Sequence, residues 1–95
     1  MVVSASTHSS AREHLFFERA LRIREARLGA DHPDTAQGLN NLAIVLHDQG
    51  DLHGARPLFE RALSIRQARL GPDHPHTLRS RQDLAAVVAA LDKQR

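Results

Sequence analysis

The sequence predicts an all-α fold in which antiparallel helix pairs stack side by side, and three observations predict it. The 95-residue chain is similar to itself after a shift of 42 positions, with 18 identities in the 37 positions that align residues 17–53 with 59–95. Within each copy, apolar residues recur at the i, i+3, i+4, i+7 spacing of an amphipathic helix. The connections between these stretches are short, so consecutive helices must be antiparallel neighbours.

One domain is expected over residues 10–95, preceded by a disordered segment at 1–9. Its first helix is expected at 10–28, because Ser10 and Glu13 have the spacing of a capping box, in which each side chain bonds a free backbone N–H of the other residue. By the alignment, this helix corresponds to the third helix of the chain.

Three further helices are expected at 34–49, 52–70 and 76–92. Between the first two of these, Gly50 can adopt the left-handed conformation that ends a helix, and Asp51 can cap the next one. Each repeat unit consists of a first and a second helix. The chain therefore begins with the second helix of one unit, continues with the first and second helices of the next unit, and ends with the first helix of a third. The apolar faces consist of Leu39, Leu42, Ala43 and Leu46, then Leu58, Phe59, Ala62, Leu63 and Leu70, and finally Leu84, Val87, Val88 and Leu91.

The loops before the second and fourth helices carry almost the same eight residues, "LGADHPDT" at 28–35 and "LGPDHPHT" at 70–77. An acid next to a histidine suggests catalysis, but its recurrence between two amphipathic helices favours a structural turn. In this interpretation a glycine ends one helix, an aspartate caps the next, a proline occupies its first turn, and the histidine packs against the preceding helix. These residues are Gly29, Asp31, His32 and Pro33 in the first loop and Gly71, Asp73, His74 and Pro75 in the second.

The composition argues against catalysis and cofactor binding. A chain of this length buries a modest core, in which a deep catalytic pocket is not expected. There is no cysteine, no G-x-S-x-G nucleophile motif and no Gly-rich phosphate loop, and the seven histidines lack the spacing of zinc ligands. We therefore predict a non-enzymatic protein without a metal or another cofactor.

The location and source are predicted from equally general features. No stretch of about 18 apolar residues and no secretory signal are present, which predicts a cytoplasmic protein without a membrane segment. The absence of cysteine agrees with a reducing compartment. Arginine supplies twelve of the thirteen basic residues, and together with the frequent alanine this favours a high-GC bacterial source.

Arginines on the two second helices could form a nucleic-acid surface, since phosphate contacts dominate such binding. Against this, Glu18 stands four residues before Arg22, where the two can form an ion pair on a helix. The aromatic residues are three phenylalanines, so nucleic-acid bases lack a stacking surface. Nucleic-acid binding is therefore disfavoured for the candidate arginines, which are Arg19, Arg22, Arg24, Arg27, Arg61, Arg66 and Arg69.

One nearly complete unit, "LNNLAIVLHDQGDLHGARPLFERALSIRQARLGPDHPHT" at 39–77, resembles a tetratricopeptide repeat. The resemblance is to the 42-residue variety found in kinesin light chains and in many bacterial multi-repeat proteins, and it covers about residues 12–95. It implies a right-handed α-solenoid of antiparallel helix pairs whose concave groove holds a peptide or a partner protein. The chain departs from the pattern at Leu46 and Leu52, where the family has aromatic residues, and in its more divergent last unit.

The resemblance also implies which residues line the groove. In the family, the position of Asn41 helps to grip a peptide backbone or a carboxylate, and an amide suits this role because it both donates and accepts hydrogen bonds. A hydrogen bond of Asn41 within its own repeat is the structural alternative. The lysine of a carboxylate clamp is replaced by Asn40 and Gln82, so a clamp for chaperone tails is disfavoured. The expected groove residues are Asn40, Asn41, Ile44, His47, Asp48, Gln82 and Ala86.

A second hypothesis treats the chain as a terminal piece of a longer repeat array. It begins on a second helix and ends on a first helix, and about three units are usually needed for stability. The last helix then lacks a neighbour on one side, which predicts self-association or marginal stability. In this hypothesis copies associate or stack through their terminal helices and need no peptide ligand. The exposed end face is expected to comprise Leu84, Val87, Val88 and Leu91.

Overall fold

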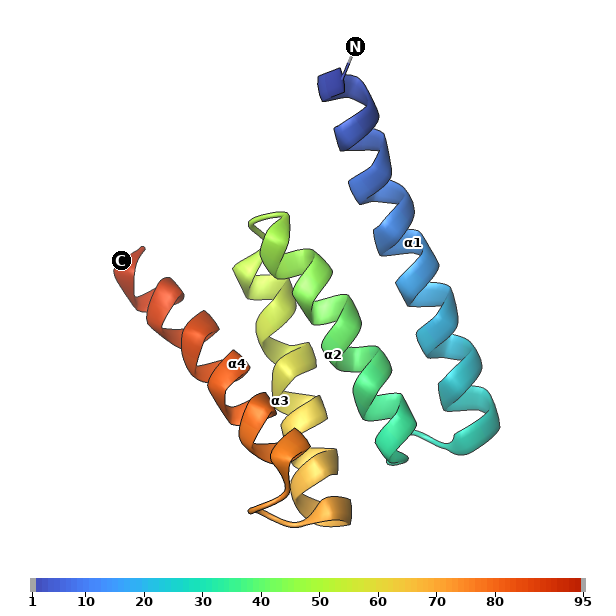
Figure 1. Cartoon of the computed structure of the whole chain (residues 1–95), viewed down its shortest axis with the longest axis vertical. Coiled ribbons are helices and arrows are strands. Elements are labelled where there is room, and N and C mark those ends of the chain that lie inside the picture. The colour runs from blue at the N-terminus through green and yellow to red at the C-terminus, as the bar shows by residue number, and fades with distance from the viewer. Residues whose placement is uncertain (1, 95) are drawn as a thin grey trace.

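The computed structural model contains four α-helices joined by short loops (Figure 1). It describes the backbone of residues 2–94 and the side chains of residues 12–94. Consecutive helices run antiparallel, and each packs against the helices next to it in the chain. The described residues contain no strand, so the predicted all-α fold of stacked helix pairs is confirmed. The helices are α1 (Val2–Leu28), α2 (Pro33–Asp48), α3 (Leu52–Leu70) and α4 (Pro75–Lys93).

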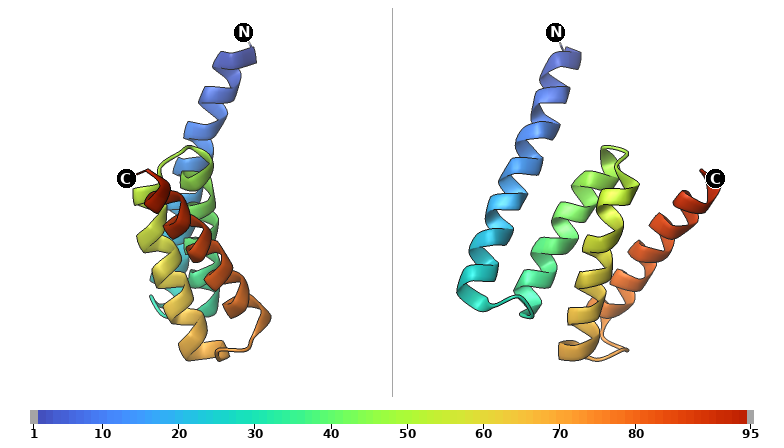
Figure 2. Two further views of the ribbon diagram at one scale, coloured as in Figure 1. Left: turned by 90° about the vertical axis from the view of Figure 1, so that its left-hand side faces the viewer. Right: turned by 180° about the vertical axis from the view of Figure 1, so that it is seen from behind.

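The four helices lie side by side, with α1 and α4 at opposite edges and α2 and α3 between them (Figures 1 and 2). The N-terminal half of α1 extends past the ends of the other three helices. The central helices α2 and α3 supply most of the core, because each of them packs against a neighbouring helix on both sides. The buried apolar cluster comprises Leu21, Ala36, Leu39, Leu42, Ala43, Leu46, Ala55, Phe59, Ala62, Ile65, Val87 and Leu91.

The bounds of three helices agree with the sequence prediction to within one residue, whereas α1 differs at its start. Helix α1 begins at Val2 and not at Ser10, so it includes most of the segment expected to be disordered at 1–9. The reason is that residues 2–9 contain neither glycine nor proline, which are the residues that interrupt a helix. Ser10 therefore lies inside α1 and does not mark its beginning.

The loop histidines are the residues that cap α2 and α4. Each of these helices begins with a proline, so the capping position falls on the histidine before it. The Nδ1 atom of His32 accepts a hydrogen bond from the backbone N–H of Asp34 at 3.0 Å. In the second loop, Nδ1 of His74 accepts one from the backbone N–H of His76 at the same distance of 3.0 Å. His32 and His74 thus cap the two helices, a role that the sequence predicted for the neighbouring aspartates.

The expected caps Asp31 and Asp73 are wrong by one residue, since the proline at the first helical position decides which residue precedes the helix. The glycines behave as predicted, with φ of +98° at Gly29 and +95° at Gly71. Glycine adopts such positive φ values without the steric cost that a Cβ atom imposes. In the first loop, the Thr35 hydroxyl also donates to the Gly29 carbonyl at 2.7 Å, which ties the two ends of the loop together.

Replacing either capping histidine by alanine is expected to lower the free energy of unfolding by about 1 kcal/mol, because a free N–H of the first turn loses its acceptor. His32→Asn and His74→Asn are expected to retain most of the stability, since asparagine is a preferred cap. Urea denaturation measures the differences. The matched control is His53→Ala on the exposed surface of α3, which should change stability by less than about 0.5 kcal/mol. Equal losses in the alanine and asparagine variants would contradict the capping role.

Candidate functional site

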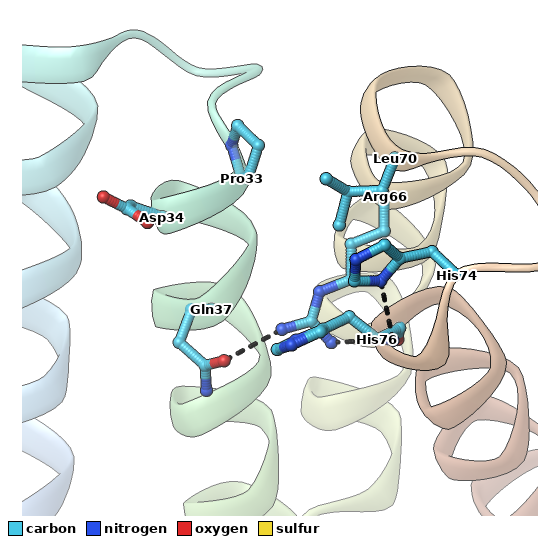
Figure 3. Close-up of a pocket in the computed structure, with 7 residues that line it drawn as sticks. All are labelled: Pro33, Asp34, Gln37, Arg66, Leu70, His74 and His76. Atoms are coloured by element: carbon cyan, nitrogen blue, oxygen red, sulfur yellow. Dashed lines mark hydrogen bonds between the residues drawn. The ribbon is translucent and has the colours of Figure 1, made fainter.

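A groove runs between α2 and α4, and side chains of α3 form its floor. It consists of three adjoining cavities that share residues where they meet. The first has a volume of about 280 Å³ and lies at the loop end (Figure 3), lined by Pro33, Asp34, Gln37, Arg66, Leu70, His74 and His76. The second, also of about 280 Å³, is lined by Gln37, Asn40, Asn41, Ile44, Arg66, His76 and Arg79. The third, of about 90 Å³, is lined by Ile44, His47, Phe59, Asp83 and Ala86. We call this surface the α2–α4 groove.

Helical spacing explains which side of α2 faces the groove. Gln37, Asn41 and Ile44 follow one another at intervals of four and three residues, so they form one stripe along the helix. The stripe that contains Leu39 and Ala43 is fully buried in the core. The same amphipathic pattern that fixes α2 in the core therefore turns an amide-rich stripe toward the groove.

Five of the seven residues expected to line the groove do so, namely Asn40, Asn41, Ile44, His47 and Ala86. The other two lie outside its lining. Asp48 ends α2, where its carboxylate lies 3.7 Å from the Nδ1 atom of His47, and Gln82 is exposed on α4. The structural alternative for Asn41 is realised as well, since its Oδ1 accepts a hydrogen bond from Gln37 Nε2 at 2.8 Å.

Ten lining residues were not expected from the sequence to line the groove. For two of them a signal existed, because Arg79 and Asp83 occupy in the last unit the positions that Gln37 and Asn41 occupy one repeat earlier. They also form an ion pair of 3.3 Å, which repeats the Gln37–Asn41 hydrogen bond at the equivalent place. The missed residues are Pro33, Asp34, Gln37, Phe59, Arg66, Leu70, His74, His76, Arg79 and Asp83.

Arg66 is the residue that joins the walls of the groove to its floor. Its side chain is 3% exposed and reaches from α3 to both neighbouring helices. One terminal nitrogen donates to Gln37 Oε1 on α2 at 3.0 Å. The other donates to the His76 carbonyl at 3.3 Å (Figure 3) and to Ser80 Oγ at 2.9 Å, and both acceptors lie on α4. A single guanidinium therefore fixes three helices relative to one another.

The hydrogen-bond partners of this buried guanidinium are neutral, which sets its electrostatics. Burial lowers the pKa of Arg66, because removal from water disfavours the charged form, and the nearby carboxylate of Asp83 partly opposes this effect. The guanidinium remains charged near neutral pH, since arginine loses its proton only in strong base. The groove thus has a permanent cation in its floor.

Two buried acceptors in the groove lining lack a partner. Oδ1 of Asn40 and Oδ2 of Asp83 are buried and accept no hydrogen bond from the part of the chain that the structure describes. Buried polar groups in proteins are normally paired, by protein, water or ligand. Both residues line the groove, although these two oxygen atoms themselves are covered by the protein.

A second open surface lies on α4, on the side turned away from α2, and one residue of α3 also lines it. It is a shallow apolar groove of about 560 Å³. The expected end face is only half correct, because Val87 and Leu91 are 1% and 8% exposed and belong to the core. They point toward α3, whereas Leu84 and Val88 line the open side. We call this surface the α4 outer face, and it consists of Leu63, Arg81, Leu84, Ala85, Val88, Ala89 and Asp92.

The candidate arginines do not form one free surface. Arg66 is buried, and Arg24 donates to the Asp34 carbonyl at 3.4 Å across the α1–α2 loop. Arg69 donates to the Asp31 carbonyl at 3.2 Å, and Arg61 lies 3.8 Å from a carboxylate oxygen of Glu25. Several of these side chains therefore connect neighbouring units of the fold. Among the side chains described for residues 12–94, no group of three histidine or acidic side chains could hold a metal ion. None of the four helices, over the residues that the structure describes, contains an apolar stretch that would span a lipid bilayer.

The fold and the groove together define a helical-repeat protein with a groove on one side. The family described as tetratricopeptide repeat matches residues 16–68 and 34–95, two overlapping segments that cover most of the chain. The chain belongs to the tetratricopeptide repeat family. This membership supports a role in protein–protein interaction, because such repeats are in general non-catalytic interaction modules. A search of the curated proteins gave no match.

Proposed function

We propose that the chain is a non-enzymatic interaction module that binds an extended peptide or a partner helix in the α2–α4 groove. The observation that carries this proposal is the continuity of the groove. Gln37, Arg66 and His76 line both the first and the second cavity, and Ile44 lines both the second and the third. No cofactor takes part in the proposed binding.

The dimensions and the chemistry of the groove suit a short segment. From His76 to Ala86, α4 advances about 15 Å at 1.5 Å per residue, which an extended chain spans with about four or five residues. The end near His76 contains the buried Arg66 cation, and the other end is lined by the apolar side chains of Ile44 and Phe59. A segment with hydrogen-bonding groups at one end and an apolar side chain at the other matches this order.

Peptides selected from a random display library on the 95-residue chain provide the test. Ile44→Glu places a carboxylate where the second and third cavities meet, and it is expected to weaken the selected peptides at least about tenfold. Isothermal titration calorimetry measures the dissociation constants. The matched control is Ile23→Glu, because this isoleucine is 54% exposed and lies on α1, outside the groove. Peptides that bind both variants with equal affinity would refute the proposal, provided that circular dichroism shows both variants to be folded.

A second candidate function is association between copies of the chain, and the α4 outer face favours it. Leu84 and Val88 are only partly buried there, and no helix of the described residues covers them. Val88→Asp should abolish association through this face and leave peptide binding in the groove unchanged. The two functions use different surfaces, so neither excludes the other.

A further inference from the structure

The α4 outer face is complementary to itself. Its six α4 residues form three pairs at equal distances on either side of a point between Ala86 and Val87. Each pair combines opposite properties, either a cation with an anion or a larger apolar side chain with a smaller one. The pairs are Arg81 with Asp92, Leu84 with Ala89, and Val88 with Ala85.

An antiparallel contact between two copies of α4 would bring these pairs together. When the helices cross at that midpoint, Arg81 of one copy faces Asp92 of the other. Leu84 then faces Ala89, and Val88 faces Ala85. Two-fold symmetry repeats every contact, as in isologous dimers. The central stripe at 81, 85, 88 and 92 has intervals of four, three and four residues, which is the spacing of the seam between two packed helices.

The charged ends of this face are free to take part. Arg81 and Asp92 are exposed, and neither forms a hydrogen bond or an ion pair with the side chains described for residues 12–94. The groove residues Arg79, Asp83 and Ala86 lie on the opposite side of α4, since about half a helical turn separates the two stripes. A second copy on the outer face therefore leaves the α2–α4 groove open.

Head-to-tail stacking is the alternative. In that arrangement α1 of a second copy packs on α4 in the same way as α3 packs on α2 within one chain. Four charged side chains oppose it. Glu13 corresponds to Ala55 and Arg81 to Leu39, and both of these residues are fully buried in the α2–α3 pair. In addition, the equivalent of the Arg66–Gln37 hydrogen bond would set Arg24 against Arg79. Stacking would thus bury two charges and bring two cations together.

We propose that a second copy of this chain covers the α4 outer face, through a two-fold antiparallel contact of α4 with α4. The inference rests on the second candidate function, association between copies, and adds its surface, symmetry and register. Each copy contributes one helix and Leu63 of α3. Such a contact belongs to the small interfaces of less than about 1,200 Å², so we expect a weak dimer with a dissociation constant of roughly 10 μM to 1 mM.

Sedimentation equilibrium of the 95-residue chain and of charge-reversed variants tests the inference. The wild type is expected to shift from monomer to dimer as its concentration rises. R81D and D92R each set like charges against one another at both ends of the contact, so each should weaken the dimer at least about tenfold. An equimolar mixture of R81D and D92R should form a heterodimer, because every opposed pair is again of opposite sign. The matched control is K93D, which makes the same charge change beside the face and should dimerise like the wild type.

The possible outcomes separate the inference from the function on which it rests. A wild type that stays fully monomeric at about 1 mM, the upper limit of the expected dissociation constant, refutes both. Association that is equal in all variants refutes the antiparallel register while it supports association between copies. Association that Phe16→Asp removes and R81D leaves intact indicates stacking on α1 and overturns the inference. Weak R81D and D92R homodimers with recovery in the mixture support it.

Discussion

Phe59→Ala is expected to lower the free energy of unfolding by about 3–5 kcal/mol. The ring is 2% exposed, packs in the core and also closes the floor of the third cavity. Truncation leaves a void between helices that are already held by their neighbours, so the site can relax only in part. The total stability of a domain of this size is about 5–14 kcal/mol, and the variant should therefore unfold at a much lower urea concentration.

Phe16→Ala is the matched control, because its ring is 66% exposed on α1. It makes an edge-to-face contact with Phe17 at a centroid distance of 5.4 Å, so a loss of up to about 1.5 kcal/mol is expected. Urea denaturation of the two variants, followed by circular dichroism, gives the comparison. Similar losses for the two phenylalanines would show that the core is not centred on α2 and α3.

Arg66→Ala is expected to lower the free energy of unfolding by about 2–4 kcal/mol. The substitution removes the hydrogen bonds that hold α2 and α4 to α3, and it leaves the half-buried acceptor of Gln37 and the buried acceptor of Ser80 without this donor. Some of the loss is offset, because the variant no longer buries a charge that water would solvate. The groove should also lose its defined shape, since its two walls meet through this side chain.

Arg24→Ala is the control for this prediction, because Arg24 occupies the same position one repeat earlier. Its side chain is only half-buried and makes a single hydrogen bond of 3.4 Å, to the Asp34 carbonyl. Gly38 occupies the position that Ser80 occupies in the later unit, so no hydroxyl accepts a hydrogen bond from Arg24 there. A loss below about 1 kcal/mol is expected. Chemical denaturation of both variants decides whether the three-helix network, and not arginine as such, provides the stability.

The sequence predicted the helices because their determinants are local. The signals are the apolar periodicity, the loop glycines and the repeat, and each of them is visible within about one helical turn or one repeat unit. The predicted bounds of α2, α3 and α4 accordingly agree with the structure. The prediction of the capping residues was wrong for a reason that is also local, because Pro33 moves the capping position from Asp31 to His32. The predicted start of α1 was wrong because no residue at or before Ser10 interrupts the helix, which begins at Val2.

The site was predictable only where one helix determines it. Asn40, Asn41 and Ile44 share a helix whose buried side is plain from its leucines, and they line the groove. Arg66 was taken as a surface cation, because its burial depends on acceptors that other helices supply from 14 and 29 residues away. Val87 was placed on the open face, because the rotation of α4 about its own axis is set by packing on α3.

The position of Arg66 in both the core and the groove couples ligand occupancy to folding. A ligand that binds only the folded chain stabilises it by about 2.7 kcal/mol at a concentration one hundred times its dissociation constant. Because Gln37 and Ser80 are bonded to the same guanidinium, this stabilisation reaches α2, α3 and α4 together. Slower amide hydrogen exchange in these three helices, with little change in the projecting N-terminal half of α1, is the signature of an occupied groove.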